Sequence, residues 1–396
     1  MSNNFDTIID RHKTDSLKYD FAERRGKPAD ILPLWVADMD FTAPPAVLKA
    51  LADRAAHGIF GYSDAANDDY FNVLSRWYSE RFNWRPQPEW LIKTPGVVFA
   101  ICTAIRALTR EGDAVMIQPP VYYPFSESVL ENNRRLVVNR LVYADGKYGI
   151  DLADFEEKIV SHGVKLFILC SPHNPVGRVW TEEELTVMGD ICVRHGVTVV
   201  ADEIHADFVY PGYRHRVFAS LKSTFADISV TCTAPSKTFN LAGLQISNIF
   251  VPNADIRRRL RKEINRVGYS QPNVMGLLAS RAAYAQGAEW LDELKVYLTG
   301  NLTFARSFLA SHLPQVRLVE PEGTYLIWLD FSALGLSDQA LNDLMVHKAG
   351  LWLDGGTMFG EGGEGFQRIN IACPRKTLQD ALQRLNKAVD TLEANV

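Results

Sequence analysis

Five short apolar runs constrain the fold of this chain more than any other feature. They are rich in valine and isoleucine and alternate with helical patterns, and they span Ala114–Gln118, Lys165–Cys170, Val197–Ala201, Ile228–Thr231 and Ser247–Val251. Strands that are buried on both faces have this composition, because helices cover both sides of a parallel sheet. The pattern predicts an α/β fold with a parallel or mostly parallel central sheet between helices.

The helix between the second and third runs carries its own boundary signals. Thr181 and Glu184 have the spacing of a capping box, and Gly196 can close the last turn. Residues 165–201 therefore predict a strand–helix–strand unit. In the same way, Asn253 can cap the basic helix that follows it.

The pattern changes toward both ends of the chain. Residues 287–313 predict one long helix or two, and shorter elements follow before a final helix, at Arg317–Glu320, Tyr325–Asp330, Asp338–Ala349 and Arg368–Ile371. The first 45 residues show no regular alternation of strand and helix. We therefore expect a large α/β domain at residues 46–286 and a smaller α+β domain built from residues 1–45 and 287–396.

Composition argues against several classes of function. The 396 residues carry 42 Lys and Arg against 47 Asp and Glu, and a net charge of −5 argues against a nucleic-acid surface. No stretch approaches the ~20 apolar residues that span a membrane, and the N-terminus lacks a secretory pattern. The five cysteines are far apart and show no zinc-type spacing. These features predict a soluble, cytoplasmic protein without a metal site.

Polar motifs follow three of the predicted strands. Ser171–Gly177, which includes Asn174, follows one strand, and Asp202 follows the next. Lys237 follows the strand after that, in a predicted polar turn. Open α/β sheets bind their ligands at this edge. A buried acid there needs a cationic partner, and a lysine whose pKa is lowered by burial can attack a carbonyl group. Taken alone, the motifs also fit an ordinary turn, a helix N-cap and a solvated lysine.

Three further motifs could bind parts of a small ligand. Val97 and Val98 begin an apolar helix, and the free N–H groups at a helix start bind phosphate. Tyr122, within Pro119–Pro124, could cover a flat ring. Arg368 carries the planar guanidinium that commonly binds a carboxylate.

Each motif is weak by itself, but their order along the chain is specific. Together they resemble the fold-type I pyridoxal-phosphate enzymes of the class I/II aminotransferase superfamily, over nearly the whole chain. Shorter segments look like the MalY/PatB-type cystathionine β-lyase (C–S lyase) branch of that superfamily. These segments are Ala37–Phe41, His57–Tyr62, Cys170–Pro175, Asp202–His205, Gln286–Leu291 and Ala372–Arg375.

The resemblance implies pyridoxal 5′-phosphate (PLP) as the cofactor and a role for each matching residue. Lys237 is expected to hold PLP as a Schiff base and to act as the base on the substrate's Cα proton. Asp202 is expected to pair with the ring nitrogen. Asn174 is expected to hydrogen-bond the 3′-oxygen of the ring and to contact the substrate, and Tyr122 is expected to stack on the ring.

Other matching positions are expected to hold the phosphate and the substrate. The amides of Val97 and Val98, together with Ser236, would bind the phosphate. Arg368 would bind the substrate's α-carboxylate. Tyr62 would reach the phosphate of the neighbouring subunit, so the resemblance also implies a homodimer with shared active sites.

The resemblance leaves some positions open. Tyr123 would either touch the substrate or simply pack within the protein. His205 stands where aminotransferases often carry a tyrosine near the 3′-oxygen, and we place it at the cofactor without a defined role. Gln245 and Ala234 depart from the arginine and serine that aminotransferases commonly place on the phosphate. Two hydroxyl side chains could replace the missing contact, those of Thr233 and Ser236.

Three functions fit this set of residues. The first is a C–S β-lyase that cleaves L-cystathionine or related cysteine S-conjugates by α,β-elimination to a thiol, pyruvate and ammonia. The second is an aminotransferase, and the third is a regulatory or binding protein that keeps PLP for its structure. The expected active-site residues serve lyases and aminotransferases alike. The lyase prediction therefore depends on the branch-like segments and on Gln245.

Overall fold

The computed structural model describes residues 3–64 and 68–393, so the outermost residues of the predicted small domain, 1–2 and 394–396, lie outside the described residues. A seven-stranded sheet forms the centre of the molecule, in the order β2-β10-β9-β8-β7-β3-β4. Its strands are β2 (Leu91–Thr94), β3 (Ala114–Ile117), β4 (Arg135–Val138), β7 (Leu166–Cys170), β8 (Thr198–Asp202), β9 (Ser229–Thr233) and β10 (Ser247–Phe250). All neighbours pair in parallel except β10, which is antiparallel to both β2 and β9. The predicted mostly parallel α/β sheet is confirmed.

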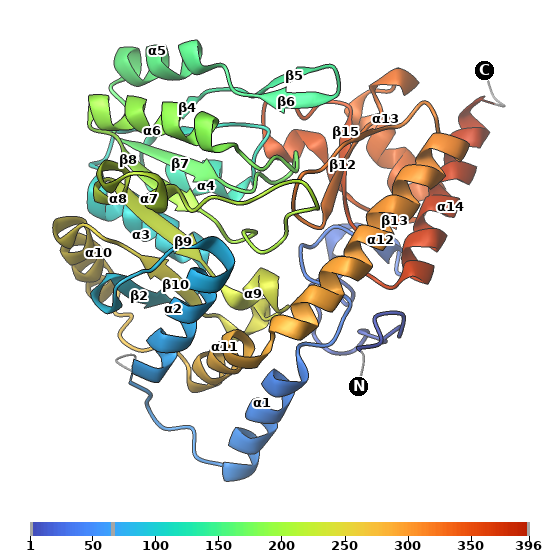
Figure 1. Cartoon of the computed structure of the whole chain (residues 1–396). Coiled ribbons are helices and arrows are strands. Elements are labelled where there is room, and N and C mark those ends of the chain that lie inside the picture. The colour runs from blue at the N-terminus through green and yellow to red at the C-terminus, as the bar shows by residue number, and fades with distance from the viewer. Residues whose placement is uncertain (1–2, 65–67, 394–396) are drawn as a thin grey trace.

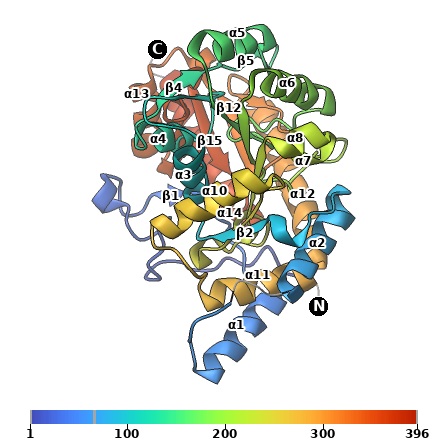
Figure 2. The ribbon, with the colours of Figure 1, turned by 90° about the vertical axis from the view of Figure 1, so that its left-hand side faces the viewer.

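Helices cover both faces of this sheet, as the apolar runs predicted. Alternate residues of β7 point to opposite faces: Phe167 and Leu169 pack in one cluster, and Leu166 and Ile168 in another. The first cluster includes residues of α5 (Leu152–His162), α6 (Glu182–His195), α7 (Phe218–Leu221) and α8 (Ser223–Asp227). The second includes residues of α3 (Val97–Leu108), α4 (Pro124–Leu130) and α10 (Ala254–Arg266). Figures 1 and 2 show the two helical layers on either side of the sheet.

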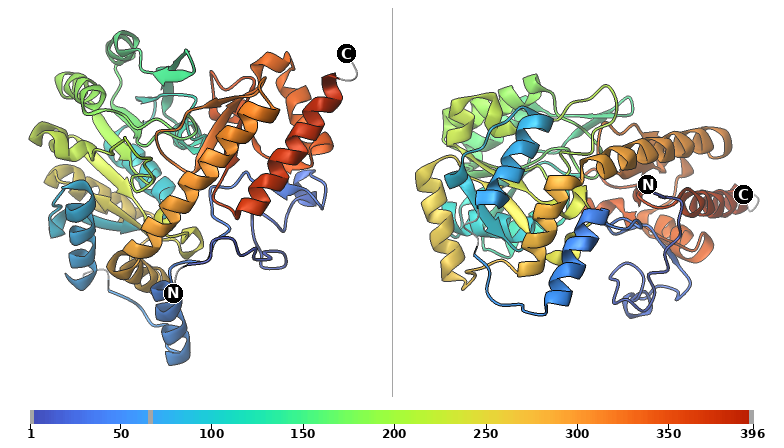
Figure 3. Two further views of the ribbon diagram at one scale, coloured as in Figure 1. Left: turned by 45° about the vertical axis from the view of Figure 1, so that its right-hand side comes forward. Right: turned by 60° about the horizontal axis from the view of Figure 1, so that its bottom comes forward.

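A second, antiparallel sheet forms near the C-terminus, in the order β11-β12-β15-β14. Its strands are β11 (Arg317–Val319), β12 (Leu326–Asp330), β14 (Asp354–Gly355) and β15 (Phe366–Asn370). The N-terminal region joins this part of the molecule, because β1 (Leu32–Pro33) pairs with β13 (Leu351–Trp352). The long helices α12 (Ala288–His312) and α14 (Arg375–Glu393) lie side by side along it (Figure 3). The division into two domains at residues 46–286 and 1–45 with 287–396 stays a prediction.

The remaining elements complete the chain. Two short strands, β5 (Val142–Ala144) and β6 (Lys147–Gly149), form a hairpin. The helix α11 (Val274–Gln286) contacts α1 (Pro45–His57), α2 (Asp68–Phe82) and α12. The other short elements are η1 (Glu23–Arg25), η2 (Pro88–Trp90), α9 (Pro235–Thr238), η3 (Ala242–Leu244), η4 (Ser332–Leu334), α13 (Asp338–Asp343), η5 (Leu344–Lys348) and η6 (Gly356–Phe359).

Most predicted boundaries hold to within two residues; β15, for example, begins two residues before the strand expected at Arg368–Ile371. Three further differences concern β9, the helix after Ser337 and the segment of Lys237. Thr181 and Glu184 form the capping box and Asn253 caps α10, as predicted. The strand expected at Ile228–Thr231 runs two residues further, because the Thr233 hydroxyl is buried and donates to the carbonyl of Asn248 in β10. The helix expected at Asp338–Ala349 divides into α13 and a π-helical turn, η5.

The third difference concerns the segment that carries Lys237. We expected a polar turn there, whereas residues Pro235–Thr238 form the single helical turn α9. Pro235 starts the turn, and its carbonyl accepts a hydrogen bond from the N–H of Phe239 (2.9 Å).

Among the helices of the described residues, none combines the length and the apolar composition that a membrane span requires.

Candidate active site

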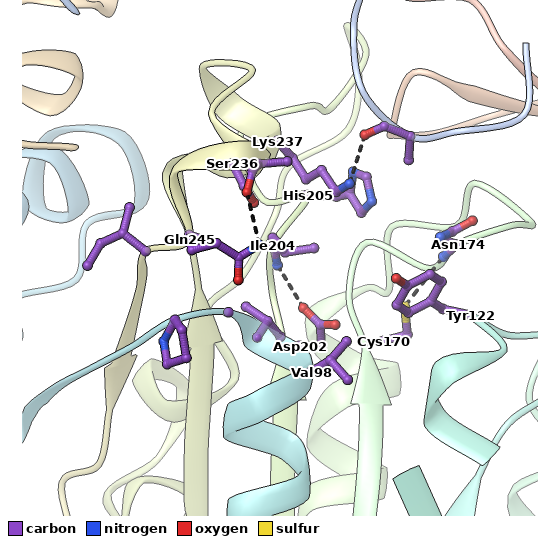
Figure 4. Close-up of a pocket in the computed structure, with 17 residues that line it drawn as sticks. Val98, Tyr122, Cys170, Asn174, Asp202, Ile204, His205, Ser236, Lys237 and Gln245 are labelled. Carbon is purple, nitrogen blue, oxygen red and sulfur yellow. Dashed lines mark hydrogen bonds between the residues drawn. The ribbon is translucent and has the colours of Figure 1, made fainter. Parts of the chain in front are cut away.

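The carboxyl ends of three parallel strands open into one cavity. Cys170 at the end of β7, Asp202 at the end of β8 and Cys232 in β9 stand in register across the sheet. Figure 4 shows Asp202, Lys237 and Tyr122 at this cavity. The residues that line it are Ala37, Pro95, Gly96, Val97, Val98, Tyr122, Cys170, Asn174, Asp202, Ile204, His205, Ala234, Ser236, Lys237, Ala242, Gln245 and Ile246. Eight predicted site residues are among them: Val97, Val98, Tyr122, Asn174, Asp202, His205, Ser236 and Lys237.

Asp202 is a buried carboxylate at the floor of this cavity. It accepts a hydrogen bond from the backbone N–H of Ile204 (3.1 Å), and none of the ion pairs among the described residues includes it. Burial raises the pKa of Asp202 to about 7, although Ile204 and the charge of Lys237 act in the opposite direction. A buried carboxylate in this state is stabilised by any cation that enters the cavity.

Lys237 enters the same cavity from α9. Its amine donates a hydrogen bond to the carbonyl of Ala37 (2.7 Å). Burial lowers the pKa of Lys237 to about 8, and the charge of Arg368 acts in the same direction. A lysine with this pKa is partly neutral near physiological pH, so its lone pair is available to attack a carbonyl carbon.

The first turn of α3 borders the cavity opposite Lys237. Val97 and Val98 begin this twelve-residue helix, whose first N–H groups have no partners within the helix. At Gly96, the space that a Cβ atom would face is open to 4 Å. Ser236 also lines the cavity, whereas the Thr233 hydroxyl is engaged by Asn248 (2.7 Å). Of the two hydroxyl groups considered for the phosphate, only that of Ser236 reaches the cavity.

Tyr122, Asn174 and His205 complete the wall. The N–H of Tyr122 donates to the carbonyl of Asn174 (3.0 Å), which fixes the two segments relative to each other. His205 is buried, and its Nδ1 atom has no partner among the described residues. Burial lowers the pKa of His205, and the charges of Lys237 and Arg368 add to this effect, so its imidazole is neutral.

Arg368 is not one of the residues that line the cavity. It lies behind Asn174, whose side-chain oxygen accepts a hydrogen bond from Nη1 of Arg368 (3.0 Å). Nη2 donates to the carbonyl of Trp35 (2.8 Å) and to the carboxylate of Asp354. Both side chains of the Arg368–Asp354 ion pair are 3% exposed. The guanidinium therefore already has a carboxylate partner in this structure.

A strap of residues 35–41 crosses the site and was not recognised as part of it. The carbonyl of Ala37 accepts hydrogen bonds from Lys237 and from the hydroxyl of Tyr325 (3.0 Å). Lys18, which is fully buried, forms an ion pair with Asp40 (2.8 Å). Segment Ala37–Phe41 entered the sequence analysis only as part of the resemblance, since a backbone carbonyl leaves no sequence signal.

Asn370 and Arg11 bind the rest of this strap. Asn370 in β15 donates to the carbonyls of Val36 (2.7 Å) and Asp38 (2.6 Å). Arg11 forms ion pairs with both Asp38 and Asp40, each at 2.7 Å. Asp38 also acts on Lys237, because its negative charge raises the pKa of that amine against the effect of burial. The strap thereby connects the C-terminal sheet to the reactive lysine.

The two remaining predicted residues lie outside the cavity. Tyr123 packs against the ring of Tyr122 (centroids 5.5 Å apart) and against Phe359 (6.2 Å). Tyr62 is 98% exposed and lines a groove that shares Pro95 and Gln245 with the cavity. The structure therefore places Tyr62 beside the site without bringing it into contact with Lys237 or Asp202.

The chemistry of the cavity fits the PLP that the resemblance implies. A pyridinium N–H would give Asp202 the cation that it lacks, and the α3 N-terminus beside open Gly96 suits a phosphate. The unpartnered Nδ1 of His205 is a further polar atom available to a ligand. Lys237 is positioned to bind an aldehyde carbon between these two ends.

Comparison with known proteins agrees with this geometry. The chain is 47% identical over 386 residues to the cystathionine β-lyase PatB of Bacillus subtilis, covering 98% of this chain and 100% of PatB. Cystalysin from Treponema denticola, whose crystal structure contains PLP, superposes with a TM-score of 0.95 at 38% identity, over 99% of this chain and 100% of that one. A PLP-bound C–S lyase from Staphylococcus hominis superposes with a TM-score of 0.91 at 32% identity, over 98% of each chain.

A family model covers most of the chain as well. The model for aminotransferases of class I and II matches residues 29–385, a span that includes every residue of the cavity. The chain belongs to the aminotransferase class I and II family.

Proposed function

We propose that this protein is a PLP-dependent C–S β-lyase that cleaves L-cystathionine or related cysteine S-conjugates. The observation that carries the proposal is the 47% identity to a cystathionine β-lyase along the whole chain. The cavity supports it, because a buried carboxylate, Asp202, and a lysine whose pKa burial lowers to about 8, Lys237, line it together. The cofactor is pyridoxal 5′-phosphate, as in the structural relatives.

Three residues would hold the cofactor ring. Asp202 would pair with the ring nitrogen and keep it protonated, Tyr122 would stack on the ring, and Asn174 would donate to the 3′-oxygen. The backbone N–H groups of Val97 and Val98, with the Ser236 hydroxyl, bind the phosphate. When bound, PLP withdraws electrons from the substrate's Cα and makes its proton acidic.

Lys237 carries out the proton transfer. Lys237 would hold the cofactor through its amine and, once that amine is free, would take the proton from Cα of the substrate. The electron pair of the Cα–H bond then forms a Cα–Cβ double bond, and the Cβ–S bond breaks. The sulfur leaves as a thiolate, and hydrolysis of the three-carbon remainder gives pyruvate and ammonia. The strap carbonyl of Ala37 accepts a hydrogen bond from the free amine (2.7 Å) and so fixes its position in this structure.

Arg368 would bind the substrate's α-carboxylate, and Tyr62 would reach the phosphate of a second subunit. A homodimer is supported by the exposure of Tyr62 and of two apolar neighbours, Ile59 (64% exposed) and Phe60 (58%). These side chains sit beside the groove that adjoins the cavity.

An aminotransferase is the second candidate, because the family model that matches the chain describes that activity. The two reactions differ after Cα has lost its proton. An aminotransferase needs a keto acid to complete its cycle, whereas a β-lyase does not.

One assay separates them. Purified holoenzyme is mixed with L-cystathionine in the absence of any keto acid, and pyruvate and free thiol are measured together. Equal amounts of both, over many turnovers, support the lyase. A single conversion of the cofactor to its pyridoxamine form, without thiol, contradicts the lyase and establishes half of a transamination.

A further inference from the structure

Asp354 is a buried carboxylate for which the proposed reaction has no role. It begins β14 and stands directly opposite Arg368 of β15 in the antiparallel register. Cross-strand neighbours on one face of a sheet lie within side-chain contact. The register therefore places the two charges together, and both are almost entirely removed from solvent.

The donors of Arg368 are largely committed in this arrangement. Nη2 donates to Asp354 and to the Trp35 carbonyl, and Nη1 donates to Asn174. Nε is buried and has no partner among the described residues. The guanidinium also lies over the ring of Phe359, 4.9 Å from its centroid. Asp354 therefore balances the charge of the guanidinium, and its hydrogen bonds and the Phe359 ring fix its position.

A substrate carboxylate would be a second anion on one guanidinium. Arg368 carries a single positive charge, so Asp354 and the substrate together would leave one buried negative charge in excess. The negative charge of Asp354 also acts at the cavity wall: burial raises the pKa of Tyr122, which lines the cavity, and Asp354 adds to that rise. Asp354 and the substrate carboxylate therefore compete for the guanidinium of Arg368.

We propose that Asp354 is the resident counter-ion of Arg368, and that amino-acid substrates bind by taking the guanidinium from it. Asp354 then sets how tightly a carboxylate binds, because it stabilises the empty site and opposes the filled one. This inference rests on the proposed role of Arg368.

The test is ligand binding to the holoenzyme of Asp354→Asn, which removes the charge and keeps the shape. The probes are L-alanine, which has a carboxylate and no leaving group, and L-alaninol, which lacks the carboxylate. The shift of the cofactor's absorbance reports binding of either. We expect L-alanine to bind about tenfold more tightly to the variant, since one unbalanced buried charge is gone, and L-alaninol to bind as before.

Two further variants test the sign of the effect. Asp354→Ser, also neutral but smaller, should strengthen L-alanine binding as well, and Asp354→Glu, which keeps the charge, should leave it near the wild-type value. Glu322→Gln is the matched control, because it removes a carboxylate from a partly buried arginine, Arg178, outside the cavity. It should change neither affinity. Asp354→Asn should also unfold at a lower temperature without ligand, because Arg368 loses its partner.

Two results would contradict the inference. Unchanged or weaker L-alanine binding in both neutral variants overturns the inference, and equal changes for the two probes do so too. Arg368→Ala separates this from failure of the proposed function: a variant that still prefers L-alanine to L-alaninol shows that the carboxylate binds elsewhere. If Arg368→Ala loses that preference and the Asp354 variants do not respond, the inference alone is wrong.

Discussion

Two buried carboxylates, one at the proposed cofactor end of the site and one at the proposed substrate end, are kept in different states. Asp202 at the cofactor end accepts a backbone hydrogen bond and has no ion pair among the described residues, whereas Asp354 at the substrate end is paired with Arg368. Burial raises the pKa of both, and Arg368 offsets part of this rise for Asp354. In the proposed function, Asp202 meets a permanent cationic ligand and is unpaired without it, while Asp354 lies near an exchanging ligand and is balanced by Arg368.

The difference between the two carboxylates affects both the stability of the ligand-free protein and the binding of ligands. An unpaired buried charge lowers the stability of the ligand-free protein, and binding of the cofactor recovers that free energy. A paired charge avoids most of this loss without a ligand, but the pair must be broken for a ligand to bind. The following predictions test each end of the site in turn.

The largest effect is expected for Lys237→Ala at the cofactor end. Pyruvate formation from L-cystathionine should fall by at least about 10³-fold, because the base that moves the Cα proton is gone. The absorbance band of lysine-bound PLP should disappear. Lys93→Ala is the control, since burial also lowers the pKa of Lys93 to about 8 but this lysine lines a different cavity. Activity that survives in Lys237→Ala would remove this lysine from the mechanism.

Asp202→Asn should separate stability from function. The rate should fall by about 10²–10³-fold and PLP should bind more weakly, because the ring nitrogen loses its counter-ion. Assays at saturating PLP keep the two effects apart. Normal kinetics would mean that Asp202 does not contact the cofactor.

The same variant should make the ligand-free protein more stable at high pH. Folded Asp202 holds its proton up to about pH 7, whereas the unfolded chain releases it near 3.8, so stability is lost as pH rises through this window. Asparagine removes this loss, so the free energy of unfolding should rise by about 4 kcal/mol at pH 8 and should not change below pH 4. Thermal unfolding of the apoprotein at both pH values measures it. Equal stabilities at pH 8 would show that the carboxylate has a partner.

At the substrate end, Arg368→Ala should change binding and spare the cofactor. KM for L-cystathionine should rise by about 100-fold, because a buried charge-assisted contact is lost, while the PLP absorbance remains. The variant also leaves Asp354 unpaired, so Arg368→Lys, which keeps the charge, serves as the second variant and should have a smaller effect. Loss of the PLP absorbance in both would place Arg368 at the cofactor instead.

The smallest effect is expected for Tyr62→Phe. Loss of one hydroxyl on a phosphate oxygen of the partner should raise the dissociation constant of PLP by about 3- to 10-fold, with the dimer intact by size-exclusion chromatography. Tyr213→Phe, which removes another exposed hydroxyl (residue 43% exposed), is the control. Unchanged PLP affinity in Tyr62→Phe would argue against a shared site.

Much of the site could be predicted from the sequence because its signals are local. Asp202 and Lys237 each follow a buried apolar strand within a few residues, and parallel strands bring such positions to one edge. Asp354 could have been found in the same way, since it follows the apolar run Leu351–Leu353. It was missed because that run is short and lies outside the central sheet.

The mostly parallel sheet, the helix caps and the residues at the strand ends can be predicted from local sequence, because strand burial, capping and turn formation depend on neighbours a few positions away. The groups that meet across long distances in the chain depend instead on the fold as a whole. The Ala37 carbonyl reaches Lys237 from 200 positions earlier in the chain, and the β14–β15 register pairs Asp354 with Arg368. Such contacts arise from the packing of whole elements, so no local pattern of residue types records them.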